Sequence, residues 1–529
     1  MTLRKHKEYQ MSQIIRVYAK SINKDRMMLN LLPLIKHNGK KVSFKKANFT
    51  KEDVFETIYS SDYYFENFGD YKGVVESWLE NDYMDLINKE STTQEKRFVS
   101  ILPITLNVYK VTNTKNIEDY ESSDQIWVML KHADCERSAA GETSIIKQLN
   151  DYFSVGYSSD KERIENHEEL DLSTWLISNI TNQFDDVIEV SDVQAETTDP
   201  LLCMAQARIL ADDVERLLQY QDVMARPALI ESLSQLFVLH MGLYVLRVAR
   251  ILPVAIQNKT IAPSCTCHEQ LTVEKAYACD YKPKFQMDMQ PKYSSKLAKI
   301  SARNIDMHEQ QLYALYESLV ILRKKQDFMM HTLNQKKFTI EEIVSFDLQQ
   351  YWSQCENYFK QQYEQLNDLL EVLPNITENY FENYIAAIVQ NFGKHFVGFY
   401  KRLLSVCFGK NLDRGILMQT ASHKKYSLGI ELLDTIMHLA MIEKREGVYE
   451  NKVLRLDQFL TFLRERYGFY IDELLEDYDQ SQFYSAIRES KKYLTMKLQE
   501  IGYYEALSDA YNTQWLIARY DISRRVSYE

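Results

Sequence analysis

From residue 200 onward the spacing of apolar residues is that of helices, and breaking residues are few. Asp199 and Pro200 are residue types favoured at a helix N-cap and at the first helical position. The apolar segment after Arg226 predicts a helix that stops near Pro253. Residues 294–337 contain neither glycine nor proline, which predicts one long helix or two stacked helices.

Capping signals divide the rest of this helical pattern. Thr339 and Glu342 fit a capping box that opens a helix, and another helix is predicted from residue 377 to about 407. Near the end of the chain, the segment LDQFLTFLRERY predicts an amphipathic helix closed by Gly468 as a left-handed cap. The apolar face of that helix consists of Leu456, Phe459, Leu460 and Leu463.

The first 200 residues have a mixed pattern. Residues 40–49 (KKVSFKKANF) are compatible with a strand or hairpin that has a basic polar side. Residues 98–111 alternate after a proline and predict a strand, while residues 126–130 fit either a partner strand or a helical segment. Residues 154–199 hold twelve acidic against two basic residues, which indicates a solvated boundary with a helix between residues 172 and 180.

These patterns predict a mainly α fold, a long multi-helix body with a small α+β N-terminal region. The chain of 529 residues has only 14 glycines and 9 prolines, fewer than sheets and long loops require at their turns. The predicted order is a basic α+β region at 1–150, an acidic boundary at 151–199, a helical body at 200–415 with a cysteine-rich loop at 262–291, and a C-terminal helical domain at 416–529.

Cysteine usage and apolar runs bear on the compartment. The seven cysteines are odd in number and unevenly spaced, unlike a secreted disulfide framework. The first residues lack the apolar core of a signal peptide. The most apolar run, residues 236–246, is shorter than the roughly 20 residues that span a bilayer, so it predicts a buried core helix. We therefore expect a cytoplasmic protein with no membrane partner.

Charge is distributed unevenly along the chain. The net charge is −12, yet residues 1–50 hold twelve basic and only two acidic side chains. Clustered cations are what phosphate neutralisation requires, and Phe44 and Phe49 alternate with lysines there. The segment therefore predicts a DNA or RNA contact, or else a basic arm docked on the acidic remainder or on an acidic partner subunit. The predicted nucleic-acid-binding residues are Lys40, Lys41, Lys45 and Lys46.

The segment PSCTCHEQLTVEKAYACD holds the densest group of soft ligands. Four such side chains within fifteen residues fit a tetrahedral structural zinc site. Their C-x-C-H spacing departs from the common paired C-x2-C arrangement, and two adjacent ligands bind one metal less readily. The alternative interpretation is a loop of reduced cysteines without a metal, and no other cofactor is expected. The predicted ligands are Cys265, Cys267, His268 and Cys279.

Motifs of nucleotide-driven or hydrolytic chemistry are missing from the sequence. The Gly-Lys pairs lack the upstream glycine and the following hydroxyl of a P-loop. There is likewise no dinucleotide fingerprint, nucleophile elbow or His-Glu-x-x-His zinc helix. We therefore lean against an enzyme.

One short segment, Arg303 to His308 (RNIDMH), resembles the active-site motif of HEPN ribonucleases, which are small helical bundles. The resemblance implies that Arg303 stabilises phosphate charge and that His308 transfers a proton. The two residues are five apart, off the i, i+4 spacing of helical neighbours, so a bend or a second chain would have to bring them together. The alternative is a solvated polar helix face.

Two further stretches, LNLLPLIKHNGKK at residues 29–41 and LDQFLTFLRERYGFYID at residues 456–472, together with the helical body, resemble the G component of bacterial phosphorothioation-dependent restriction systems. This resemblance implies a non-catalytic helical subunit that works with ATPase and nuclease-related proteins against unmodified DNA. No functional residue follows from it.

Three hypotheses result. The preferred one is a non-catalytic helical scaffold or adaptor in a multiprotein defence or restriction assembly; the missing catalytic motifs, the charge asymmetry and the 36 tyrosines, which suit subunit contacts, favour it. The second is a helical ribonuclease that uses Arg303 and His308. The third is nucleic-acid binding through the basic N-terminal segment.

Overall fold

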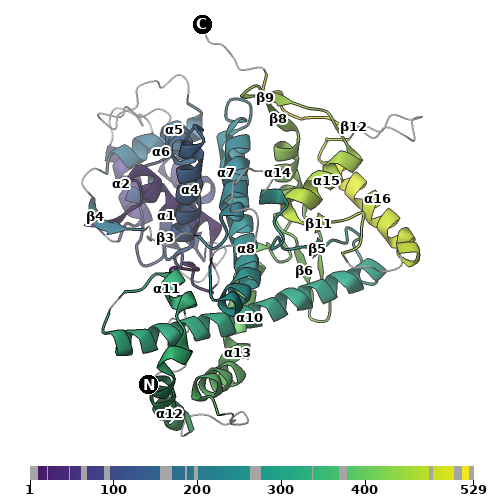
Figure 1. The fold of residues 1–529 in the computed structure, drawn as a ribbon. Helices are drawn as coiled ribbons and strands as arrows, with labels where there is room; N and C mark the ends of the chain where they lie inside the picture. Colours follow the sequence, from purple (N-terminus) through teal and green to yellow (C-terminus); the bar gives the residue numbers. More distant parts are fainter. Residues whose placement is uncertain are drawn as a thin grey trace. The chain divides into compact units, whose positions relative to one another are not determined.

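The computed structural model describes residues 10–20, 22–46, 48–60, 68–88, 96–154, 170–184, 187–195, 201–261, 276–335, 337–367, 378–475, 480–504 and 515–523. The chain forms two compact units. The N-terminal unit consists of Ile22–Thr197 and Leu217–Ser234. The main unit consists of Met1–Ser21, Thr198–Arg216 and Gln235–Glu529. Helices predominate in both, as the mainly α prediction requires (Figure 1).

The N-terminal unit combines short helices with two small antiparallel sheets, β1 with β4 and β2 with β3. Its core lies where α1 contacts α4 and α5, at side chains such as Leu32, Trp127 and Leu149. In chain order its elements are α1 (Lys24–Lys36), β1 (Lys40–Phe44), α2 (Lys51–Ser60), η2 (Phe68–Tyr71), α3 (Lys72–Asp82), β2 (Met84–Ile87), β3 (Arg97–Ile101), η3 (Val108–Lys110), α4 (Ser122–Ala139), α5 (Ile145–Phe153), α6 (Leu172–Asn182) and β4 (Ile188–Gln194).

Two segments of this unit differ from the strands that alternating apolar and polar residues predicted. The strand predicted over residues 98–111 ends at Ile101, and the apolar residues that follow are buried in turns and in η3. Residues 126–130 lie inside α4, so the helical interpretation of that segment is confirmed and the partner strand is wrong. Both segments are buried, and burial alone does not distinguish a short strand from a helix.

The main unit carries the long helices. Its elements are α7 (Met204–Leu218), α8 (Arg226–Asn258), β5 (Phe285–Gln286), α10 (Lys296–Leu333), α11 (Ile340–Ser345), η6 (Leu348–Tyr351), α12 (Trp352–Asn367), α13 (Tyr380–Cys407), β6 (Leu417–Gln419), β7 (Lys424–Tyr426), α14 (Ile430–Ala440), β8 (Ile442–Arg445), β9 (Val448–Asn451), β10 (Leu454–Arg455), α15 (Leu456–Tyr467), β11 (Phe469–Tyr470), η7 (Gln480–Gln482), α16 (Tyr484–Glu500) and β12 (Trp515–Leu516). The last residues of α7 and the first residues of α8 belong to the N-terminal unit.

Helix α10 is the longest described element, with 38 residues. The Ser295 hydroxyl accepts from the Ala298 amide at its start, and Asn334 adopts the left-handed conformation at its end. Figure 1 shows α16 near its N-terminal end and α11 and α12 near its C-terminal end. Stacked rings of Tyr316 and Phe396, with centroids 4.9 Å apart, join it to α13. The uninterrupted pattern of residues 294–337 is thus one helix.

Helix α8 continues past the predicted stop at Pro253 as far as Asn258. A proline inside a helix is tolerated where packing supports the turn around it. Among the described residues, α8 is the helix that has the length and composition to cross a membrane, and 83% of its most apolar window is buried inside the protein, as in a core helix.

Several local signals were read correctly from the sequence. The Thr339–Glu342 capping box is present at the start of α11. Gly468 ends α15 with φ 74°, and a Cβ atom there would lie 2.1 Å from the carbonyl oxygen of Pro283. Glycine is therefore needed both for the backbone conformation and for the close approach. That approach lets β11 pair in parallel with β5 and fixes the chain that enters β5.

Candidate functional site

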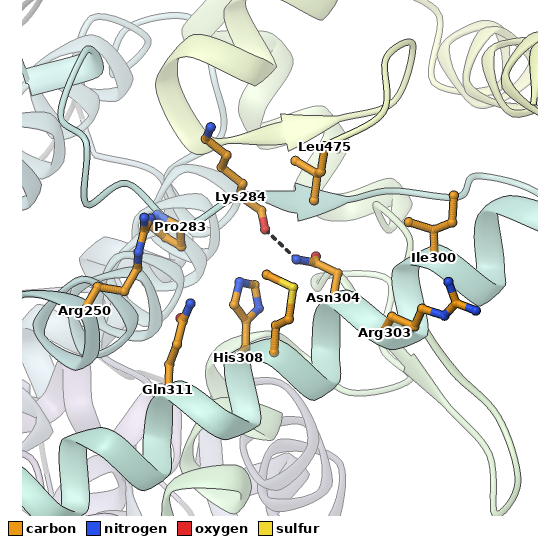
Figure 2. Close-up of a pocket in the computed structure, with 10 residues that line it drawn as sticks. Arg250, Pro283, Lys284, Ile300, Arg303, Asn304, His308, Gln311 and Leu475 are labelled. Carbon is orange, nitrogen blue, oxygen red and sulfur yellow. Dashed lines mark hydrogen bonds between the residues drawn. The ribbon is translucent and has the colours of Figure 1, made fainter. Parts of the chain in front are cut away.

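A small cavity lined by both polar and apolar side chains lies beside α10 and measures about 130 Å³. One wall is a face of α10, and the others come from α8, from the chain before β5 and from the segment after β11 (Figure 2). Its lining contains both members of the predicted ribonuclease pair. The lining residues are Arg250, Pro283, Lys284, Ile300, Arg303, Asn304, Met307, His308, Gln311 and Leu475.

Asn304 ties α10 to the chain that enters β5. Its Nδ2 donates to the Lys284 carbonyl oxygen at 3.1 Å, drawn as a dashed line in Figure 2. Its Oδ1 accepts from the Gln286 amide at 3.0 Å. Buried backbone N–H and C=O groups that no neighbouring strand pairs need side-chain partners, and Asn304 supplies them here. The sequence analysis considered this residue only as part of the ribonuclease-like motif, so its structural role was missed.

His308 lines the pocket and is almost completely buried. Its Nδ1 lies 2.8 Å from the Tyr426 hydroxyl, and its ring packs edge-on against Phe285 with centroids 5.0 Å apart. Desolvation, assisted by the nearby charge of Arg250, lowers the pKa of His308 to about 3, against the effect of a backbone hydrogen bond at Lys284. The imidazole is therefore neutral near pH 7 and has structural partners. Such a group is poorly matched to proton transfer at neutral pH.

Arg303 lies on a different part of the α10 surface. Its side chain is exposed, and Figure 2 shows it pointing away from His308. The helix is continuous through both residues, so no bend brings the guanidinium to the imidazole. The geometry within this chain does not form the phosphate-binding and proton-transferring pair that the ribonuclease hypothesis requires.

The four lysines of the basic segment lie on and just after β1, in the N-terminal unit. Strand β1 pairs with β4, which comes from the acidic boundary. Each lysine has a carboxylate within 4.0 Å: Lys40 with Asp192 at 4.0 Å, Lys41 with Asp124 at 2.7 Å, Lys45 with Glu189 at 3.9 Å and Lys46 with Asp53 at 2.8 Å. This arrangement favours the interpretation of a basic arm docked on the acidic remainder. The nucleic-acid contact stays a prediction.

Three of the four predicted zinc ligands, Cys265, Cys267 and His268, lie outside the described residues. Cys279 is buried against Cys203, whose sulfur lies 3.9 Å from a guanidinium nitrogen of Arg247. The hydrogen bond from Cys203 lowers the pKa of Cys279 to about 6, against the effect of burial. No group of three or more metal-ligating side chains occurs within the described part of the chain. The zinc site stays a prediction.

A second polar cluster joins α7, α8 and α15 inside the main unit, centred on Asp213. The Asp213 carboxylate accepts from Arg466 Nε at 2.6 Å and from the Tyr467 hydroxyl at 2.8 Å. His240 Nε2 lies 2.8 Å from the same carboxylate, and Gln206 Nε2 lies 2.6 Å from His240 Nδ1. Because the amide donates to Nδ1, the imidazole carries its proton on Nε2 and is neutral. Each of these side chains has at least one hydrogen-bonding partner, while Arg466 Nη1 is buried and makes no hydrogen bond within the described residues.

Asp212 balances the charges of this cluster. Its carboxylate pairs with Arg466 and, at 2.8 Å, with Arg216. Burial opposes ionisation, but these two guanidinium groups lower the pKa of Asp212 to about 2. Burial lowers the pKa of His240, so its neutral ring adds no charge to the two carboxylates and the two guanidinium groups. The same carboxylates raise the pKa of Arg466 against burial.

The sequence contained only a faint signal of this cluster. His240 stands inside the most apolar run of the chain, where a polar residue must find a partner when buried. Nothing in the sequence indicates that the partners are Asp213 and, more than 220 residues further along, Arg466. The Asp213 cluster is a buried junction of helices: its residues are 0–7% exposed, except Arg216 at its edge, whose side chain is 16% exposed.

The fold and these sites define a mainly α-helical protein whose buried polar clusters hold its own helices together. Residues 4–520 match the family model described as methylation-associated defense system protein MAD7, and the chain belongs to this family. No curated protein gives a significant match. The expectation of a defence-system component is confirmed by this family membership; the resemblance to the G component of phosphorothioation-dependent restriction systems is not confirmed.

Proposed function

We propose that this chain is a non-catalytic scaffold or adaptor subunit of a methylation-associated defence assembly, in which it binds other proteins of the system. Membership of a defence-system family supplies the setting. The observation that carries the proposal is the Asp213 cluster, in which ionisable groups from three helices pair with one another in the interior of the main unit. Such a junction specifies a rigid arrangement of helices, which suits a platform for partners.

The state of the polar pocket supports the same conclusion. A nuclease needs a general acid or base that titrates near the working pH and lies within reach of the phosphate ligand. Burial holds the pKa of His308 at about 3, and the Arg303 side chain points elsewhere. The pocket of about 130 Å³ is also small against typical ligand pockets of about 300–1,000 Å³. We therefore prefer the scaffold function over the ribonuclease function.

The experiment is affinity purification of the full-length tagged chain from cells that express the whole defence system, with and without nuclease treatment. We expect the same proteins of the system to co-purify in both cases. Cells without the chain should lose protection against phage, and complementation with Arg303→Ala or His308→Gln should restore it. The proposal is wrong if the chain purifies alone, or if either variant is folded but loses both protection and an RNA-cleaving activity of the wild type.

A further inference from the structure

A large groove runs along the outer face of α16 in the main unit, with a volume of about 670 Å³. One wall is the outer stripe of α16, and the opposite wall comes from the start of α15 and the segment after β11. The lining residues are Leu456, Asp472, Glu473, Tyr484, Ile487, Arg488, Lys491, Lys492, Thr495, Met496 and Gln499. Those from α16 recur at three- and four-residue spacing, as expected for a single helix face.

Helix α16 is anchored by its other face, which leaves this stripe available. Leu494 and Leu498 are buried, and the Ser490 hydroxyl accepts from the Met289 amide at 3.0 Å. At its N-terminal end, Phe483 and Ile487 pack against a buried cluster that includes α10 residues. The helix is thus fixed in place by contacts that do not involve the basic residues of the groove.

The groove has an excess of positive charge. Asp472 and Glu473 on the far wall are already paired with Arg464, at 3.5 Å and 2.6 Å. Arg488, Lys491 and Lys492 form no ion pair with any residue in the described part of the chain. These three cations stand at i, i+3 and i+4, a spacing at which like charges repel and weaken a helix. Carboxylates supplied by a partner would relieve that repulsion.

Apolar side chains stand at both ends of the basic cluster. Tyr484 is 69% exposed and Met496 is 50% exposed. They are twelve residues apart, which corresponds to about 18 Å along a helix. An exposed apolar residue at each end with cations between them matches the pattern of an amphipathic helix that carries acidic residues beside its apolar ones.

We propose that this groove docks an acidic, amphipathic helical segment of another protein of the defence assembly. The inference rests on the proposed scaffold function and identifies the surface that binds a partner. A polyphosphate chain fits the groove less well, because it has no apolar side chains to cover the exposed Tyr484 and Met496. The partner's carboxylates would face Arg488, Lys491 and Lys492, and its apolar side chains would cover Tyr484, Ile487 and Met496.

The test compares three versions of the full-length chain, each co-expressed with the other proteins of the system. They are the wild type, the charge reversal Arg488→Glu/Lys491→Glu/Lys492→Glu, and a matched reversal of exposed lysines elsewhere in the main unit, Lys292→Glu/Lys394→Glu/Lys410→Glu. Circular dichroism and the melting temperature first establish that each is folded. We expect the groove variant to retain at most a tenth of the co-purified partner, and the matched variant to retain wild-type amounts.

Zero-length carbodiimide cross-linking of the wild-type complex identifies the partner's contact. We expect cross-links from Lys491 or Lys492 to aspartate or glutamate residues of one partner protein. Equal recovery of partners with the folded groove variant would overturn the docking site and leave the scaffold function standing. A wild type that recovers no partner would instead remove the scaffold function. If the groove variant loses only affinity for a labelled DNA or RNA oligonucleotide, or only self-association, the acidic protein segment is the wrong occupant.

Discussion

His240 Nε2 lies 2.8 Å from an Asp213 carboxylate oxygen, and both side chains are completely buried. The contact joins α8 to α7, and Arg466 brings α15 to the same carboxylate. A histidine in the middle of an apolar helix is thereby satisfied without being ionised. This relationship connects the consecutive helices α7 and α8 with α15, which is far from them in the sequence, and it is the feature on which the scaffold proposal depends.

Replacing Asp213 should therefore be costly. Asp213→Ala leaves Arg466 buried with one fewer counter-charge and removes the hydrogen-bond partner of His240 Nε2. Removal of one member of a buried ion pair costs about 3–5 kcal/mol. We expect a loss of that size in the free energy of unfolding, measured by urea denaturation followed by circular dichroism.

Asp192→Ala, which removes an exposed carboxylate 4.0 Å from Lys40, is the control and should change stability little. Equal effects of the two variants would refute the role given to the cluster.

Stability should fall in mild acid because buried histidines resist protonation. Burial lowers the pKa of His308 to about 3 and that of His438 to about 4. The unfolded chain binds protons at these residues below about pH 6.5, so the folded state loses relative stability as pH falls from that value toward the folded pKa. At pH 5 the loss is about 2 kcal/mol for each residue. Urea denaturation between pH 7.5 and 5 measures it.

His308→Gln tests the assignment of part of this pH dependence. The variant lacks the titrating group. Between pH 7 and pH 5 its free energy of unfolding should therefore fall by about 2 kcal/mol less than that of the wild type. The hydrogen bonds of Asn304 to the backbone of Lys284 and Gln286 remain in this variant and should preserve the fold. An unchanged pH profile in a folded variant would mean that His308 is not neutral in the native state.

Gly468 should be far less replaceable than another glycine with positive φ. At Gly468 an added Cβ would lie 2.1 Å from the Pro283 carbonyl oxygen, whereas at Gly447, with φ 86°, it would meet no atom within 4 Å. Gly447→Ala should cost about 1 kcal/mol for its backbone conformation. Gly468→Ala should cost more than about 3 kcal/mol, because the β5–β11 approach must also open. Thermal denaturation of both variants compares them, and similar melting temperatures would contradict the close packing.

The lysines of the basic segment should differ in their effect on stability. Lys41 lies 2.7 Å from Asp124, a carboxylate with 7% exposure, while Lys45 and Glu189 are both exposed and 3.9 Å apart. Lys41→Ala should therefore lower the free energy of unfolding by about 1 kcal/mol, and Lys45→Ala should have no measurable effect. Urea denaturation of the two variants decides this. A larger loss from Lys45→Ala would contradict the internal-docking interpretation.

Local signals in the sequence predicted much of the helical fold. The capping roles of Thr339 and Gly468 depend on neighbours within a few positions, so they can be predicted from the sequence. The close approach of Gly468 to Pro283 depends on tertiary packing and could not be predicted. The partners of His240 could not be read, since Arg466 reaches Asp213 only through tertiary packing. Pro253 shows the same limit, because the packing of α8 overrides its preference to end a helix.

In the candidate sites too, local features were predictable from the sequence and features set by tertiary packing were not. The sequence identified His308 as chemically notable, but its burial under Phe285 and Tyr426 depends on β5 and β7, which no local pattern placed beside α10. The stripe of α16 is periodic in sequence, yet its exposure depends on which face packs against the rest of the unit. Residue type was therefore predictable, and solvent access was not.

The most direct test of the scaffold function is reconstitution of the purified defence-system proteins with and without this chain, read by native mass spectrometry. The scaffold account predicts that the other proteins form a defined complex only when the chain is present, and that the complex contains it in fixed stoichiometry. Assembly of the same complex without the chain would contradict the account.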